Sequence, residues 1–197
     1  DSAHLIFPRS TVKAFQAAAM VRNGLELEPR LLALGASVFL PRGAKNATSE
    51  SERIAFTNSN ATDLFISLHA DSHTNPSAQG VATYFYGSDA HGVHSVVGER
   101  FANLIQREIC ARTDLLNCQT HAKSWDLLRL TVAPTVRIDL GYLSNPRDAK
   151  RLSTAALRDQ LAEAMIVAIQ RLYLSAEDDA KTGTLKISDL RRAGLRN

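Results

Sequence analysis

The sequence lacks the features that mark several specialised classes of protein. Its 197 residues include only two cysteines and one tryptophan, and aromatic residues make up 6% of the chain. No apolar run approaches the roughly 18 residues that cross a bilayer, so we expect no membrane span. The formal charge of +3 is small, and the lysines and arginines are scattered through predicted helices, so we expect no nucleic-acid partner.

The two cysteines leave their chemistry open. Cys110 and Cys118 lie eight positions apart, a spacing that allows a disulfide in an oxidising compartment or two thiols in a reducing one. A metal role is not indicated, because neither belongs to a C-x-x-C pair and His121 is the only nearby partner.

The remaining composition is that of a soluble globular protein, with 45% apolar and 22% charged residues. The length fits one domain, and helical and strand patterns alternate along it. Strands separated by helices predict an α/β fold, a mainly parallel twisted sheet with helices on both faces. We expect helices at 12–34, 49–60, 93–112 and 154–174, and strands at 36–40, 63–68, 80–86 and 134–140.

The composition changes after Leu174. Residues 1–174 are predicted to form the domain, whereas 175–197 read as a flexible, charged C-terminal tail outside the core. The tail is either a frayed terminus or a docking and regulatory segment. Thr182 and Thr184 are its exposed hydroxyls, where a kinase can add about two negative charges.

Polar residues recur where predicted strands end. His69 follows the strand that ends at Leu68, Asp139 lies near the end of the strand at 134–140, and His4 stands where a first strand would end. Sites in open α/β sheets collect at the carboxyl ends of strands. A lone histidine there is usually only hydrogen-bonded, but two histidines with a carboxylate also fit a metal or catalytic site.

Four segments, in order, carry a family resemblance. They are D-S-A-H at 1–4, D-L-F-I-S-L-H-A-D at 63–71, G-V-A-T-Y-F-Y at 80–86 and P-T-V-R-I-D-L-G-Y-L-S-N at 134–145. Together they resemble the motifs of the zinc-dependent N-acetylmuramoyl-L-alanine amidases (type 3) of bacterial cell-wall turnover. The resemblance extends from residue 1 to about residue 174, and it implies the amidase/phosphorylase-like fold.

The resemblance also assigns site residues, two of them altered. It places zinc ligands at His4, at His69 and on the first helix, where the family's glutamate falls at Gln16. It places the general base at Asp139, where the family has glutamate. A neutral amide is a poor zinc ligand, and a carboxylate about 1 Å short can cost on the order of a hundredfold in rate. We therefore expect zinc to be weakly bound or absent, and the domain to be a pseudo-enzyme; Glu26 as a replacement ligand looks strained.

Within the family, an altered zinc triad with a T-G-T tail resembles a degenerate mycobacterial branch. That resemblance implies a cytoplasmic regulator, phosphorylated by a serine/threonine kinase, that stimulates the enolpyruvyl transferase of peptidoglycan precursor synthesis. Thr182 and Thr184 would be the switch, and Cys110 and Cys118 reduced thiols. The alternative is a secreted, cell-wall zinc amidase that cleaves the bond between muramic acid and L-alanine in peptidoglycan or muropeptides. A third possibility is a non-catalytic module that holds muropeptides.

Residues near the predicted site complete the expectations. Arg137 interrupts an apolar strand where the family has leucine or valine, so it either pairs with an acid or obstructs the old site. His121 and Trp125 are candidates to line a groove beside the final strand. Of the three aromatic residues at 84–86, at least one should face the core.

Overall fold

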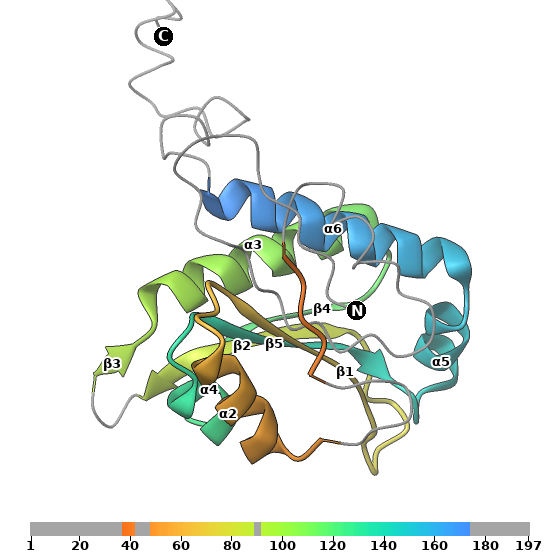
Figure 1. The fold of residues 1–197 in the computed structure, drawn as a ribbon. Helices are drawn as coiled ribbons and strands as arrows, with labels where there is room; N and C mark the ends of the chain where they lie inside the picture. Colours follow the sequence, from red (N-terminus) through yellow and green to blue (C-terminus); the bar gives the residue numbers. More distant parts are fainter. Residues whose placement is uncertain (1–36, 42–47, 89–91, 174–197) are drawn as a thin grey trace, which may run out of the picture.

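The computed structural model describes residues 37–41, 48–88 and 92–173 of the chain (Figure 1). The predicted first helix lies outside these residues, as do His4, Gln16, Glu26, Thr182 and Thr184. The helices are α2 (Glu50–Ser59), α3 (Val96–Arg112), α4 (Asp126–Leu130), α5 (Pro146–Leu152) and α6 (Ala155–Tyr173). The strands are β1 (Phe65–Asp71), β2 (Val81–Ser88), β3 (Val93–His94), β4 (Asn117–Lys123) and β5 (Thr135–Tyr142).

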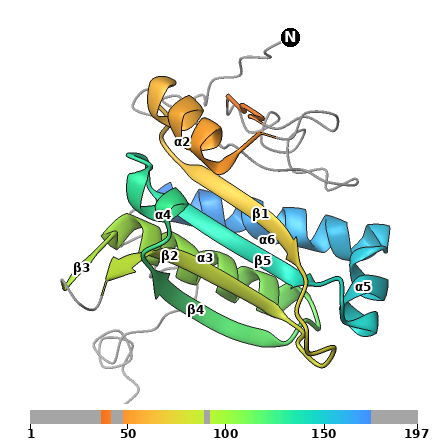
Figure 2. The same ribbon diagram turned by 90° about the horizontal axis from the view of Figure 1, so that it is seen from below.

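The strands form one mixed sheet (Figure 2). β1 runs parallel to β5, and β4 runs parallel to β2. β2 runs antiparallel to both β5 and β3. The predicted α/β class, with helices on both faces of the sheet, is confirmed. The mixed character arises from β2, which lies between β4 and β5 and reverses direction relative to β5.

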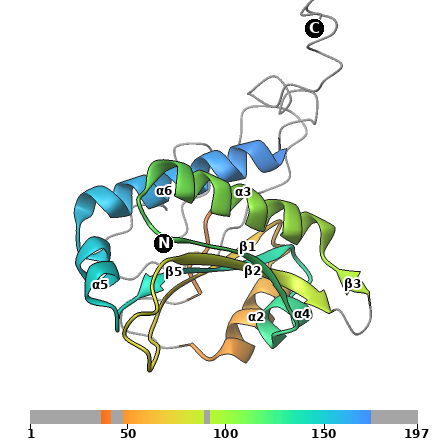
Figure 3. The same ribbon diagram turned by 180° about the vertical axis from the view of Figure 1, so that it is seen from behind.

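Helices cover the two faces of the sheet unequally. The long helices α3 and α6 lie on one face, and the short helices α2 and α4 lie on the other (Figures 1 and 3). The main apolar core fills the space under α3 and α6, with Ile66, Phe101 and Met165 among its fully buried side chains. A second, small cluster on the opposite face joins Phe65 to Leu127, with Ile54 packed against it.

Local sequence explains where the helices begin. Ser49 caps α2: its hydroxyl accepts from the Glu52 amide at 3.2 Å, and the Glu52 carboxylate accepts from the Ser49 amide at 2.7 Å. This reciprocal capping box satisfies two amides that the helix leaves without carbonyl partners. Ser95 caps α3 in the same position, through a bond from the Gly98 amide.

Asp148 joins the start of β2 to the end of β5. It is fully buried, and its Oδ2 accepts from the amides of Gly80 at 2.8 Å and Tyr142 at 3.1 Å. Gly80 has a φ of +102°, and a Cβ at this position would stand 2.4 Å from the Leu116 carbonyl oxygen. Glycine is therefore required at the point where the loop meets β4.

The described residues also test the predictions for the strand at 36–40, for the aromatic residues on β2, for the cysteines and for a membrane span. Of the predicted strand at 36–40, residues 37–40 show a single bridge at Ser37 and no longer strand. Phe85 is buried in the core, as expected for at least one of the aromatic residues on β2. Cys110 and Cys118 are both free thiols. None of the helices described here is both long and apolar enough to cross a bilayer.

Candidate active site

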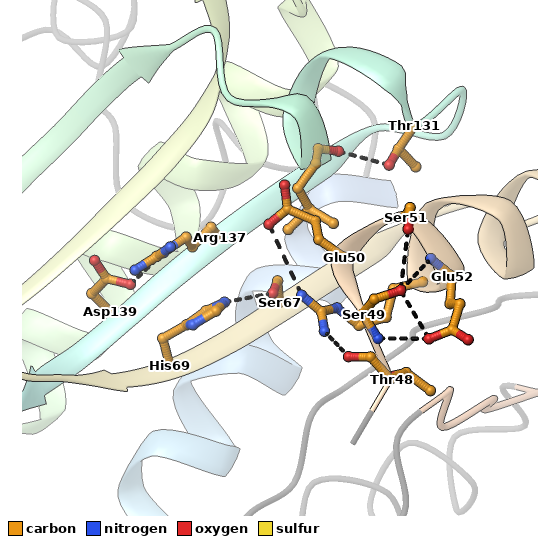
Figure 4. Close-up of polar contacts among 12 residues, drawn as sticks. Thr48, Ser49, Glu50, Ser51, Glu52, Ser67, His69, Thr131, Arg137 and Asp139 are labelled. Carbon is orange, nitrogen blue, oxygen red and sulfur yellow. Dashed lines mark hydrogen bonds and ion pairs between the residues drawn. The ribbon is translucent and has the colours of Figure 1, made fainter. Parts of the chain in front are cut away.

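The sheet brings two predicted site residues together. His69 on β1 and Asp139 on β5 are direct partners in the parallel register of these strands. Side chains two apart on a strand share a face, so Ser67 lies beside His69 and Arg137 beside Asp139 (Figure 4). This is the face that carries α2 and α4. His69 and Asp139 therefore lie together, as expected for polar residues at the ends of separate strands.

His69 is held by its own strand. Its Nε2 lies 2.8 Å from the hydroxyl oxygen of Ser67, which is itself fully buried (Figure 4). A hydroxyl both donates and accepts, so it can satisfy the ring nitrogen in either tautomer of the imidazole. The bond fixes the ring and occupies Nε2.

Asp139 is almost completely buried, with 3% of its surface exposed. Arg137 Nε donates to Asp139 Oδ1 at 2.7 Å, and the same guanidinium reaches Asp71 Oδ2 at 3.3 Å. Burial raises the pKa of Asp139 above its ordinary value, although the Arg137 bond and charge and a bond from the Tyr84 hydroxyl oppose that rise. Of the two roles predicted for Arg137, pairing with an acid is therefore the one observed.

Three ring side chains, Tyr84, His121 and Trp125, lie beside this pair, and we call them the aromatic wall. The Tyr84 ring lies 4.8 Å from that of Trp125 and 5.6 Å from that of His121, centroid to centroid. The Arg137 guanidinium lies 5.0 Å from the Trp125 ring centroid, and the Lys123 ammonium lies 5.9 Å from it. Trp125 is 39% exposed, so a partly open aromatic surface flanked by two cations borders Asp139.

Tyr84 connects the wall to the acid. Burial and the negative charge of Asp139 raise the pKa of Tyr84 to about 12, so its hydroxyl stays protonated and donates. Sequence reasoning proposed His121 and Trp125 for the groove but assigned no such role to Tyr84 or Lys123. The alternation on β2 puts Tyr84 opposite Phe85, yet it does not reveal that Tyr84 pairs with Arg137 across the strands.

The described residues do not by themselves fit a zinc centre. Zinc takes three or four nitrogen, sulfur or carboxylate donors with available lone pairs. The part of the chain that the structure describes contains no cluster of three histidine, cysteine or acidic residues of this kind. Nε2 of His69 is engaged by Ser67, and the nearest buried carboxylate, Asp139, is bound by a guanidinium. His4 and Gln16, the other predicted ligand positions, lie outside the described residues.

The fold and the site residues together define the class of domain. A mixed α/β sheet carries an imidazole and a buried carboxylate on adjacent strands, beside an aromatic, cationic wall. These features define an α/β domain whose candidate active site pairs an imidazole with a buried acid, and an arginine binds that acid.

Comparison with known sequences assigns the family. Residues 16–171, well over half of the chain, match the sequence profile of the N-acetylmuramoyl-L-alanine amidase family. The chain is 42% identical over 164 residues to N-acetylmuramoyl-L-alanine amidase CwlM of Mycobacterium tuberculosis. This alignment covers 83% of the chain and 40% of CwlM. It is 24% identical over 184 residues to amidase AmiC of Neisseria meningitidis, covering 74% and 44% of the two chains. This chain belongs to the N-acetylmuramoyl-L-alanine amidase family.

Solved structures agree with the fold. Amidase AmiC2 of Nostoc punctiforme superposes with a TM-score of 0.69 at 20% identity, over 82% of this chain and 98% of the other. Amidase Ami1 of Mycobacterium smegmatis gives 0.63 at 24% identity, over 75% and 72%. The chain spans about two fifths of the length of CwlM and of AmiC, so these relatives contain much sequence that it does not match.

Proposed function

We propose that this domain is a catalytically degenerate member of its family that regulates peptidoglycan precursor synthesis through a protein partner. The observation that carries the proposal is the double engagement of Arg137, which binds both Asp139 and Asp71. A general base must reach water and accept its proton. A guanidinium bonded at 2.7 Å occupies Oδ1 of Asp139 and opposes protonation of the carboxylate. It also places a permanent positive charge on Asp139, the register partner of His69, and this charge would repel a zinc ion bound there.

The finer parts of the proposal come from the family resemblance of the sequence. Zinc binds weakly or not at all, since His4 and His69 would share it with the neutral amide of Gln16. A serine/threonine kinase phosphorylates Thr182 and Thr184, and the phosphorylated chain binds the enolpyruvyl transferase of precursor synthesis in the cytoplasm.

Metal content tests the degenerate site directly. The experiment compares the native chain, Gln16→Glu and the double variant Q16E/R137L by mass spectrometry of bound zinc. We expect less than stoichiometric zinc in the native chain and more in each variant, because an anionic ligand is added and then a nearby cation is removed. Stoichiometric zinc in the native chain, with cell-wall digestion, would refute the proposal.

The partner is tested separately. Enolpyruvyl transferase activity is measured with the native chain and with T182A/T184A, each with and without kinase treatment. We expect stimulation only by the kinase-treated native chain. Equal stimulation by both chains would remove the two threonines from the mechanism while leaving the degenerate site intact.

The second candidate function is an active amidase that cleaves peptidoglycan or muropeptides outside the cytoplasm. The observation in its favour is the direct pairing of His69 with Asp139 in the sheet register. Release of peptides from purified cell wall, lost in Asp139→Asn, supports this candidate. Muropeptide binding without release supports instead the non-catalytic module.

A further inference from the structure

The loop between β1 and β2 is exposed at residues 72–77, yet other parts of the chain hold its backbone in place. It leaves β1 directly after Asp71, two positions past His69 of the candidate site. β1 and β5 lie side by side in the sheet, which brings the loop next to the turn that follows β5 (Figure 2). Exposed loops are usually the mobile parts of a domain, so side chains that fix this one have a role to be explained.

Two side chains of the turn after β5 bind the loop backbone. The His73 amide donates to the Ser144 hydroxyl oxygen at 3.0 Å, and Asn145 Nδ2 donates to the Pro76 carbonyl oxygen at 2.8 Å. We call Ser144 and Asn145 the loop clamp. Asn145 also caps α5, because its Oδ1 accepts from two amides of the first helical turn. Its amide nitrogen and its amide oxygen therefore have separate partners.

The clamped loop is continuous with Asp71. The Leu143 amide donates to the Asp71 carbonyl oxygen at 2.7 Å, and the Ser72 amide donates to Asp71 Oδ1 at 2.8 Å. The register between β1 and β5 shifts between His69 and Asp71, as at a β-bulge, which re-aims the side chain that follows it. Because the Asp71 side chain is 43% exposed, these bonds rather than burial set its direction.

Asp71 is one of the two acids that hold Arg137. Its Oδ2 accepts from Arg137 at 3.3 Å, whereas Asp139 Oδ1 accepts from the same guanidinium at 2.7 Å. The bond to Asp71 is near the upper limit of hydrogen-bond length, so a small displacement of Asp71 breaks it. The two-sided hold on Arg137 therefore depends on how the start of the loop is placed.

We propose that Ser144 and Asn145 are positioning residues of the candidate site. They clamp the loop at 72–80, and the clamped loop holds Asp71 where it binds Arg137. An exposed loop is thereby connected to the buried acid of the site. The proposal rests on the double engagement of Arg137, which also carries the proposed function, and it is independent of whether the domain hydrolyses peptidoglycan.

Hydrogen exchange followed by NMR in the full chain tests the clamp. Asn145→Asp keeps the capping oxygen but removes the donor to Pro76, and Ser144→Ala removes the acceptor for the His73 amide. In S144A/N145D we expect exchange of the His73 amide to rise roughly tenfold, because the loop opens locally. Exchange of the Arg137 Nε proton should rise roughly fivefold, because one of its two anchoring acids is lost.

Three comparisons make the result specific to the site. Asp71→Ala alone should speed exchange of the Arg137 proton as much as S144A/N145D does, and the two changes together should add nothing further. Ser144→Thr keeps the hydroxyl and should exchange like the native chain. S153A/N103D makes the same two kinds of change at exposed positions, at the end of α5 and on α3, and should leave both protons unchanged.

Two checks keep the readout sound. The signal of the Arg137 Nε proton is identified by its absence in R137L. Thermal unfolding verifies that each variant is folded, and Ser144→Ala alone gives the same test with half of the clamp removed.

Three outcomes overturn the proposal. The first is an opened loop with unchanged exchange of the Arg137 proton, which would separate the loop from the site. The second is an undiminished effect of S144A/N145D in the Asp71→Ala background, which would give the clamp a general structural role. The third is unchanged exchange of the His73 amide, which would mean that the loop keeps its place without the clamp. Digestion of cell wall by the native chain would refute the proposed function but leave this test intact.

Discussion

At the residue scale, Arg137 neutralises the buried acid of the candidate site. Its guanidinium satisfies a carboxylate that is 97% buried, and burial of an ionised carboxylate without a partner is costly. Arg137 is therefore part of the electrostatics of the fold. Under the proposed function, activity and stability are therefore coupled at this one side chain.

This coupling predicts the effect of Arg137→Leu. We expect the free energy of unfolding at pH 7 to fall by about 2–3 kcal/mol, because Asp139 loses its cationic partner in a buried position. In an Asp139→Asn background the same substitution should cost less than about 1 kcal/mol. Urea unfolding of the four chains of this cycle measures the difference. Equal costs in both backgrounds would mean that Arg137 acts through packing on Trp125 instead.

Glu108 gives a prediction for pH. Burial acts to raise the pKa of Glu108, but bonds from Arg112 and Arg107 and the charge of Arg171 outweigh it, so its pKa is lowered. A lowered carboxyl pKa contributes stability above the unfolded value of about 4.3, and that stability is lost as the pH falls through the folded value.

We therefore expect Glu108→Gln to lower the free energy of unfolding by about 1–2 kcal/mol at pH 7, with the difference from the native chain shrinking toward pH 3. Glu163→Gln, an exposed change on α6, is the matched control. A deficit that stays constant between pH 7 and pH 3 would contradict the ionic explanation.

At the element scale, the ends of helices and strands are secured by single polar side chains. Ser49→Ala removes the hydroxyl that accepts from the Glu52 amide and donates to the Glu52 carboxylate at 2.8 Å, while the backbone amide of residue 49 still donates to that carboxylate. We expect a loss of about 1 kcal/mol in thermal or urea unfolding. Ser51→Ala, two residues later and exposed, removes only the bond between the two serine hydroxyls at 3.1 Å and should cost about a few tenths of a kcal/mol at most.

Asp148 accepts from two buried backbone amides, so we expect its loss to cost more stability than the loss of Ser49. Asp148→Ala leaves the buried amides of Gly80 and Tyr142 without acceptors, so we expect a loss of about 3 kcal/mol. Asp148→Asn keeps an oxygen at the same place and should cost about 1 kcal/mol. Urea unfolding of the two variants measures the contrast, and similar losses would show that charge rather than the shared acceptor matters.

The sequence predicted the apolar elements well and the polar ones poorly. β1, β2, β5, α3 and α6 lie within about three residues of their expected ends, because long apolar patterns and serine caps mark them. β4, N-C-Q-T-H-A-K, was not predicted, since it is a mostly exposed edge strand without apolar alternation. Helices α4 and α5 are too short for a periodic signal.

The site shows the same division. The positions of His69 and Asp139 followed from motifs, but their pairing partners did not. Whether Arg137 would meet Asp139, Asp71 or Trp125 depends on the register between β1, β2 and β5 and on the loop before α4. Those relations join residues up to about 70 positions apart, and a strand pattern carries no information about them.

At the scale of the whole molecule, the core is built between the sheet, α3 and α6, and the tail threonines lie outside the described residues. We expect phosphorylation of Thr182 and Thr184 to change the melting temperature of the chain by less than about 2 °C, because a surface contact adds little to a domain of this size. Differential scanning calorimetry of kinase-treated and untreated protein measures the shift. A change of 5 °C or more would place the tail in the folded core.

The position of Trp125 has a practical consequence. It is the chain's single tryptophan, it is partly exposed, and it lies against Tyr84, Lys123 and Arg137 beside the buried acid. Its emission therefore reports on that wall alone, without any attached dye. Titration of a muropeptide, a metal salt or a partner protein can be followed by intrinsic fluorescence, and the spectrum of R137L serves as the reference for an open site.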